Sequence, residues 1–262
     1  YLQMSSLAVD ISTTNCNNIP NIDHDKYKQF LTNPKFHMAG WMWAHMCVYR
    51  LFEMADTRLS TWHPKSKSEI TSVLRALRAI SNLLNDHHDH EDQDVWPELI
   101  AFDTATKEHL DFLDKQHAQW HHLSTELGAL MTNLEQYDHV DEETRPAIQA
   151  TCQQLSAKFK ETRECVVLHF NDEERLLMPI VLTMSKKEQD KITKAIMERG
   201  KKEGKAAGTD KFVFCAFYDT SLHYKVMGDS LNKEVPWLVR KIVSIFLMKK
   251  EYQWFIDALE VK

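Results

Sequence analysis

Residues 85–97 read NDHHDHEDQDVWP, and a weaker copy of this stretch, HFNDEERLLMP, occupies residues 169–179. In each copy a His is followed four residues later by a Glu, and six residues after that by a Pro. The corresponding triplets are His87, Glu91, Pro97 and His169, Glu173, Pro179. Three matches in the same register indicate one structural role that occurs twice in the chain.

The His and Glu of each copy are spaced to share one face of a helix, because side chains four residues apart project from the same side. The apolar residues before each pair also recur at steps of three and four, as on a buried helix face. They are Ile70, Val73, Leu74, Leu77, Ile80 and Leu84 in the first copy, and Ile148, Cys152, Leu155, Phe159 and Val166 in the second. Buried carboxylates need a partner, so the pattern predicts a metal ion; buried salt bridges and hydrogen-bonded core histidines are the alternatives.

The composition of the 262-residue chain is typical of a single all-α domain with an appendage, since 43% is hydrophobic and only six Gly and seven Pro interrupt it. The net charge of −6 gives no reason to expect a nucleic-acid partner. The uncharged apolar runs are shorter than the ~18 residues of a transmembrane helix. Five cysteines without a CxxC pair favour packing roles in a reducing, cytoplasmic compartment.

Four long amphipathic helices are predicted, joined by short connections. The first follows Asn33-Pro34 and runs to about Ala55, and the second ends before Pro97. The third starts near Asp103-Thr104, and the fourth has Thr144 as a cap and Pro146 in its first turn. We therefore expect an up-down-up-down four-helix bundle, in which facing helices can build a dinuclear metal site in the core.

Three more histidines are expected to face this core. His45 lies on the apolar stripe of the first helix, and His117 and His121 lie on the inward side of the third. Glu174 and Asp172 could orient imidazoles, although solvated positions are the simpler interpretation for both. The remaining histidines of this region are expected on polar faces or in loops: His88, His90, His109, His122 and His139.

Together these residues resemble the hemerythrin-like (HHE cation-binding) family over about residues 30–185. The family has a single His, then HxxxE, HxxxH and HxxxE on successive helices, and the chain offers His45, His87xxxGlu91, His117xxxHis121 and His169xxxGlu173. The marine-worm oxygen carriers place an Asp five residues after the last His, whereas Glu173 stands at four. That difference argues against simple oxygen transport.

The resemblance implies a cofactor of two iron ions, cycling between Fe2+ and Fe3+, with a bridging oxygen derived from O2. It implies that His117, His121 and His169 hold one iron and that His45 and His87 hold the other. Glu91 and Glu173 would bridge both. Imidazole and carboxylate ligands also suit manganese or zinc.

The expected boundaries follow composition. Residues 1–29 form an arm, in which Tyr1-Leu2-Gln3 is a cloning remnant before a start at Met4, with no targeting peptide in residues 4–26. The bundle spans 30–198, a Gly- and Lys-rich linker spans 199–211, and a helical extension spans 212–262. The extension has two interpretations: it packs on the bundle, or it forms a membrane-surface helix pair with basic residues on one side.

Two classes of function stay open from the sequence. A carrier or sensor needs only O2 coordination, which the His-rich ligand set favours. An oxidase or oxygenase also needs a cavity for a small organic substrate, which the C-terminal extension and the aromatic content favour. Tryptophans that could line an oxygen pocket, or simply pack the core, are Trp41, Trp43, Trp96 and Trp120. We expect an oxidoreductase. The sequence does not identify its substrate, its oligomeric state, or any catalytic residue beyond the metal site.

Overall fold

The computed structural model describes residues 22–207 and 210–260, and the regular elements in these ranges are all helices. Residues 1–21, which include the predicted remnant and most of the predicted arm, lie outside the described residues. None of the helices within the described ranges is both long enough and apolar enough to cross a bilayer. The predicted all-α class is confirmed.

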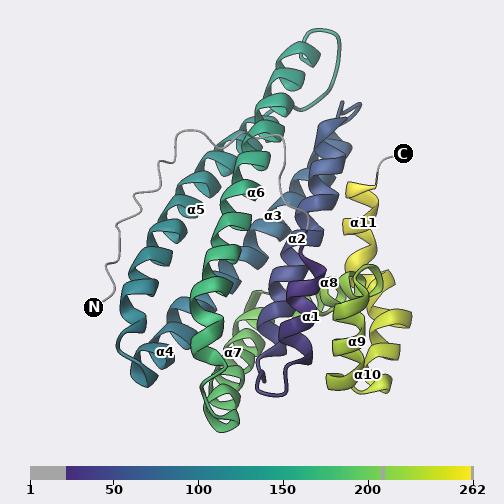
Figure 1. Cartoon of the computed structure of the whole chain (residues 1–262). Coiled ribbons are helices and arrows are strands. Elements are labelled where there is room, and N and C mark those ends of the chain that lie inside the picture. The colour runs from purple at the N-terminus through teal and green to yellow at the C-terminus, as the bar shows by residue number, and fades with distance from the viewer. Residues whose placement is uncertain (1–21, 208–209, 261–262) are drawn as a thin grey trace.

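Four long helices form the bundle and run alternately up and down in Figure 1. They are α2 (Ala39–Ser60), α3 (Lys67–His90), α5 (Thr106–Glu135) and α6 (Arg145–Val181). α6 packs along both α5 and α2, and α3 contacts α2 and α5. The inward stripes predicted for α3 and α6 are buried, from Ile70 to Leu84 and from Ile148 to Val166. Burial of these apolar stripes is the main stabilising contribution to the bundle.

The N-terminal end of the bundle differs from the prediction. α2 begins at Ala39, not after Asn33-Pro34, and a separate helix, α1 (His24–Thr32), precedes it. Asp23 caps α1 by accepting hydrogen bonds from the backbone of Asp25 and Lys26, and Asn33 ends it. α1 lies against α2 and α9, so this part of the predicted arm is an ordered helix of the fold.

The second bundle helix also departs from its predicted end. A π-helical turn, η2 (Glu91–Val95), follows α3, and α4 (Trp96–Phe102) continues beyond Pro97. Proline has no N–H to donate to residue 93, and its ring clashes with that carbonyl in a regular α-helix. The Trp96 N–H donates to the carbonyl of Glu91 five residues back. This wider turn lies at the first HxxxE motif, and π-helical turns are frequent at functional sites.

The predicted linker at 199–211 is corrected by α7 (Lys186–Ala207), which is helical through most of it. Arg199 anchors α7 to η2 by donating to Asp94 at 2.6 and 3.0 Å. Gly200 faces His90, where an added Cβ would meet the ring at 3.4 Å. The composition suggested a linker, but these contacts hold the segment as a helix against the bundle.

The C-terminal helices form a second group beside α2 and α3 (Figure 1). They are α8 (Asp210–His223), α9 (Lys225–Glu234), α10 (Trp237–Ile242), η3 (Val243–Tyr252) and α11 (Gln253–Leu259). α8, α9 and α11 contact α2, and α11 also packs on α3. Phe212, Tyr252 and Phe255 are buried among themselves, with ring centroids 5.1–5.4 Å apart.

Candidate metal centre

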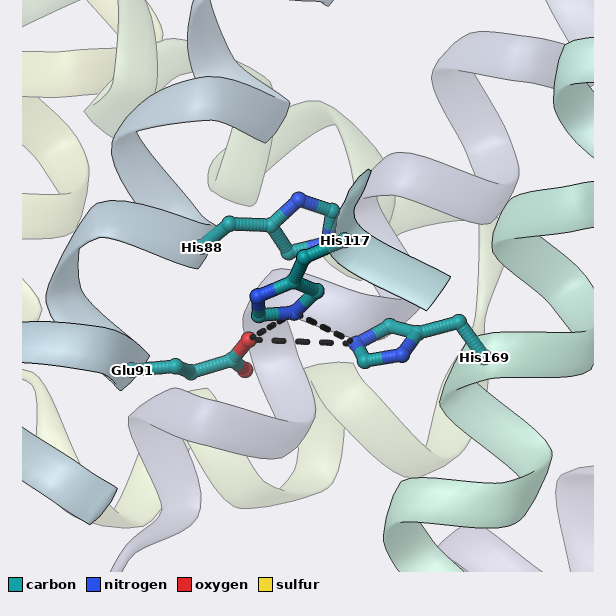
Figure 2. Close-up of side chains that lie close together, drawn as sticks. All are labelled: His88, Glu91, His117 and His169. Atoms are coloured by element: carbon teal, nitrogen blue, oxygen red, sulfur yellow. Dashed lines mark hydrogen bonds and ion pairs between the residues drawn. The ribbon is translucent and has the colours of Figure 1, made fainter. Parts of the chain in front are cut away.

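One group of buried side chains gathers from three bundle helices, as Figure 2 shows. His88 comes from α3, Glu91 from the start of η2, His117 from α5 and His169 from α6. His117 Nε2 lies 3.1 Å from His169 Nε2. Glu91 Oε2 lies 3.6 Å from His117 Nε2 and 4.0 Å from His169 Nε2. We call these four residues the three-histidine group.

A second group shares Glu91 and adds side chains from α2, α3 and α6. Its members are His45, His87, Glu91 and Glu173, which we call the two-histidine group. Glu91 Oε1 lies 2.9 Å from His87 Nε2 and 3.8 Å from His45 Nε2. Glu173 Oε2 lies 3.2 Å from His45 Nε2. The two groups are therefore adjacent, with the Glu91 carboxylate between them.

Two histidines of the three-histidine group, His117 and His169, already have partners for their outer nitrogens. His117 Nδ1 lies 3.2 Å from Asp92 Oδ1, and His169 Nδ1 lies 3.1 Å from Gln116 Oε1. Since both partners are acceptors, each Nδ1 carries the hydrogen and each Nε2 directs a lone pair inward. Two such lone pairs at 3.1 Å repel unless one nitrogen holds a second proton or a cation lies between them. The arrangement therefore calls for positive charge.

His45 is held in the same way in the two-histidine group. Its Nδ1 donates to Glu174 Oε1 at 2.7 Å, which leaves Nε2 facing Glu173. Glu174 Oε1 also accepts from the Tyr27 hydroxyl at 2.5 Å, and Lys26 Nζ contacts Glu174 Oε2. α1 thus supplies two side chains that fix the carboxylate behind His45.

Several inward-facing atoms have no hydrogen bond within the described part of the chain. Short distances such as His87 Nε2 to Glu91 Oε1 do not have hydrogen-bond geometry. The unsatisfied atoms are His45 Nε2, His87 Nε2, His88 Nδ1 and Nε2, Glu91 Oε2, and both oxygens of Glu173. Buried polar atoms almost always have a partner, and this cluster of donor atoms has the composition of a cation site.

The pKa values of two of the histidines show the same demand for positive charge, whereas burial lowers those of His87, His88 and His169. Burial lowers the pKa of His45, but the nearby carboxylates of Glu173, Glu174 and Glu91 outweigh it and raise the pKa well above its usual value. Burial also opposes protonation of His117, yet Asp92 and Glu91 raise its pKa to about 9.

The pKa values of Glu91 and Glu173 shift in opposite directions. Burial would raise the pKa of Glu91, but the surrounding histidines, His87 foremost, hold it well below its usual range. Burial and the nearby charge of Glu91 raise the pKa of Glu173 to about 8. Without a metal, protons occupy part of this centre, and a metal ion would displace them.

Aromatic side chains enclose the centre. Phe170 stacks on His45 with ring centroids 3.9 Å apart, and Trp96 stacks on His117 at 4.6 Å. Trp41 contacts His45 edge-on and donates its indole N–H to Glu91 Oε1 at 2.9 Å. Trp120 meets His88 edge-on. Trp43 instead donates to Ser230 on α9 at 3.1 Å and joins the bundle to the C-terminal helices.

Six of the seven sequence-predicted site residues come together: His45, His87, Glu91, His117, His169 and Glu173. His121 does not, because its side chain is exposed on α5, and its predicted inward position is wrong. Its place in the three-histidine group is taken by His88, which was predicted on a polar face but is 2% exposed. Glu174, for which a solvated position was the simpler interpretation, is also buried at 2%.

The sequence contained signals for these differences. His88 continues the walk Leu77, Ile80, Leu84 by a further step of four, as His87 continues it by three. On α5 the buried residue after Trp120 is Leu123. A stripe through Leu123 lies on the other side of Trp120 from His121, and it turns His121 outward.

Comparison with known proteins agrees with this geometry. Residues 49–181 match the Hemerythrin HHE cation binding domain family, a range that holds every residue of both groups except His45. An uncharacterized protein of Dictyostelium discoideum is 28% identical over 229 residues, which cover 87% of this chain and 88% of that protein. No solved structure matches the chain.

Proposed function

The chain belongs to the hemerythrin HHE cation-binding domain family, and from that premise we propose that it is a non-haem di-iron protein that binds and activates O2. We propose that His88, His117 and His169 hold one ion and that His45 and His87 hold the other. Glu91 would bridge the two, with Glu173 as the second carboxylate of the two-histidine group. The observation that supports this proposal is the set of inward nitrogen and oxygen atoms that have no hydrogen-bond partner among residues 22–207 and 210–260.

The donor set fits the proposed metal. Imidazole suits iron, copper, nickel and zinc, while carboxylate oxygens suit harder ions, so a mixed set is compatible with iron and with manganese. Facing helices of a bundle commonly supply such residues to dinuclear carboxylate centres. When bound, two ferrous ions would supply electrons for the reduction of O2. The protein's part is to orient the imidazoles through Asp92, Gln116 and Glu174 and to exclude water with its aromatic wall.

We lean to an oxidase or oxygenase that acts on a small organic substrate. The helices outside the bundle support this, because α1 reaches the centre through Tyr27 and Glu174 and the helices from α8 to α11 add a helical group on α2 and α3. We propose residues 30–198 as the unit that carries the centre. The alternative is a reversible O2 carrier or an O2 or iron sensor, which the close aromatic enclosure by Phe170, Trp96 and Trp41 favours.

An intracellular, reducing location is also proposed. It rests on Cys47, Cys152, Cys165 and Cys215, which are free thiols. Burial raises the pKa of each of these thiols, to about 11 or 12, so they are poor nucleophiles at neutral pH. Cys16 lies outside the described residues.

The test is anaerobic loading with ferrous iron, followed by exposure to O2 while the visible spectrum and a panel of small metabolites are followed. Rapid one-way oxidation that a metabolite accelerates would support catalysis. A long-lived oxygenated band that bleaches on degassing would instead support carriage. A protein that binds iron but leaves O2 untouched would refute both.

A further inference from the structure

The outer surface of α10 and the first half of η3 is unusually apolar. Six large apolar side chains are at least 40% exposed within ten consecutive residues: Trp237 64%, Leu238 55%, Val239 40%, Ile242 45%, Ile245 51% and Phe246 65%. We call these residues the α10–η3 patch. Figure 1 places α10 at the outer edge of the C-terminal helices, on the far side of the molecule from α4 and α5.

The patch is not simply a poorly packed core face, because the same segment also has a buried side. Val243 is 5% exposed and Tyr252 is fully buried, and Tyr252 packs on Phe212 and Phe255. A helix that is apolar on both its inner and its outer side is suited to burial on both. Contiguous exposed apolar residues of this kind mark interaction sites.

The charges within the patch segment have one sign, although Glu234 and Glu251 flank it. Between residues 236 and 250 the charged side chains are Arg240, Lys241, Lys249 and Lys250, all basic, although the whole chain has a net charge of −6. Lys241 lies over the Trp237 ring at 5.6 Å. Lys250 Nζ forms an ion pair with Glu251 Oε1, 3.5 Å away. The partner that fits must therefore be apolar and anionic at once.

A second copy of the chain fits poorly, since a symmetric contact would bring the same four cations together. An anionic lipid surface fits both features, because its acyl region buries the apolar side chains and its headgroups pair with Lys and Arg. Trp237 beside Lys241 is the arrangement favoured at a membrane–water interface. We propose that the α10–η3 patch binds anionic phospholipid membranes peripherally.

The experiment uses the full-length, metal-loaded protein in flotation with two kinds of vesicle. One contains phosphatidylcholine alone, and the other contains phosphatidylcholine with phosphatidylserine. We expect binding to the second kind, weakened by salt because exposed charges are screened, and much less binding to the first. Absence of binding to phosphatidylserine vesicles at low salt would overturn the proposal.

Variants then test the surface itself. Trp237→Ser with Phe246→Ser should lower the vesicle affinity at least about tenfold, because two of the most exposed apolar side chains are lost. Lys249→Gln should lower it about fivefold, as expected for one cation near an anionic surface. The matched control is Phe112→Ser with Leu168→Ser, which removes apolar side chains that are 44% and 56% exposed elsewhere. We expect this control to bind like the wild type.

Two other results would contradict the assignment. Equal binding by the Trp237→Ser, Phe246→Ser variant and the wild type would place the lipid site elsewhere. A concentration-dependent dimer in light scattering, lost in that variant and accompanied by no vesicle binding, would make a second copy the occupant. Helix content and metal content, measured for each variant, verify that the fold is retained, since all substituted residues are exposed.

Discussion

Replacement of Glu174 by Gln tests how the protein orients one of its proposed ligands. Glu174 is 2% exposed and accepts hydrogen bonds from His45 Nδ1 at 2.7 Å and from the Tyr27 hydroxyl at 2.5 Å. Gln has nearly the same size, so packing is preserved. The substitution removes the negative charge that polarises the His45 imidazole and pairs with Lys26.

The expected effect is selective. Loss of a carboxylate partner of a ligating imidazole weakens metal affinity by about 10- to 100-fold, which corresponds to about 1.4–2.7 kcal/mol. It should fall on the ion of the two-histidine group only. The imidazoles of the three-histidine group depend on Asp92 and Gln116 instead. The metal-free protein should also lose about 1–3 kcal/mol of stability, because a hydrogen bond to a charged acceptor is weakened.

The assay is an anaerobic titration with ferrous iron against a competing chromophoric chelator. Two binding events of similar affinity in the wild type should separate in Glu174→Gln, with one unchanged and one weakened. Glu135→Gln is the control, because that carboxylate pairs with Arg78 near the surface and far along α5 from the centre. Equal weakening of both binding events, or a titration of Glu174→Gln like that of the wild type, would refute this prediction.

Two further predictions concern pH and packing. The folded pKa values of Glu173, about 8, of His117, about 9, and of His45 all lie above their unfolded values, so the stability they contribute is present at low pH and is lost as pH rises through those values. The melting temperature of the metal-free protein should therefore fall as pH rises from about 6.5 to 9, and the fall should be less steep in Glu173→Gln. Metal affinity should rise over the same pH range. A wild-type melting temperature that does not change with pH would contradict this prediction. In Gly228→Ala the added Cβ would meet the Ser221 carbonyl oxygen at 2.6 Å, whereas Gly128→Ala meets nothing within 4 Å. Urea unfolding should show a loss of about 1–3 kcal/mol for the first and a gain of up to about 1 kcal/mol for the second; equal effects would show that the contact at Gly228 relaxes freely.

The bundle was predictable because its information is local and repeated. The apolar stripes of α3 and α6 follow the helical period, and α6 has Pro146 in its first turn as predicted. Thr144 stands at the N-cap position of α6, but its side chain makes no capping hydrogen bond. The two HxxxE pairs lie on those stripes, so the positions of Glu91 and Glu173 followed with them. Their burial, at 1% and 0%, agrees with this reading.

Other features depend on contacts that a sequence does not display. A helix as short as α1 is marginal alone, and Tyr27 and Lys26 hold it to Glu174 on α6. The composition of residues 199–207 gives no sign of the Arg199 contact with Asp94. On α5, Trp120 and Leu123 occupy the buried face and leave His121 exposed. The place expected for His121 at the centre is filled by His88 from another helix, α3.

We propose that each chain holds two metal ions and that His88, not His121, completes the three-histidine group. The most direct measurement is the iron-to-protein ratio after anaerobic reconstitution and removal of loosely bound metal, for wild type, His88→Ala and His121→Ala. We expect two ions in the wild type, two in His121→Ala, and one in His88→Ala. One ion or none in the wild type, or loss of iron from His121→Ala while His88→Ala keeps both, would contradict the proposed centre.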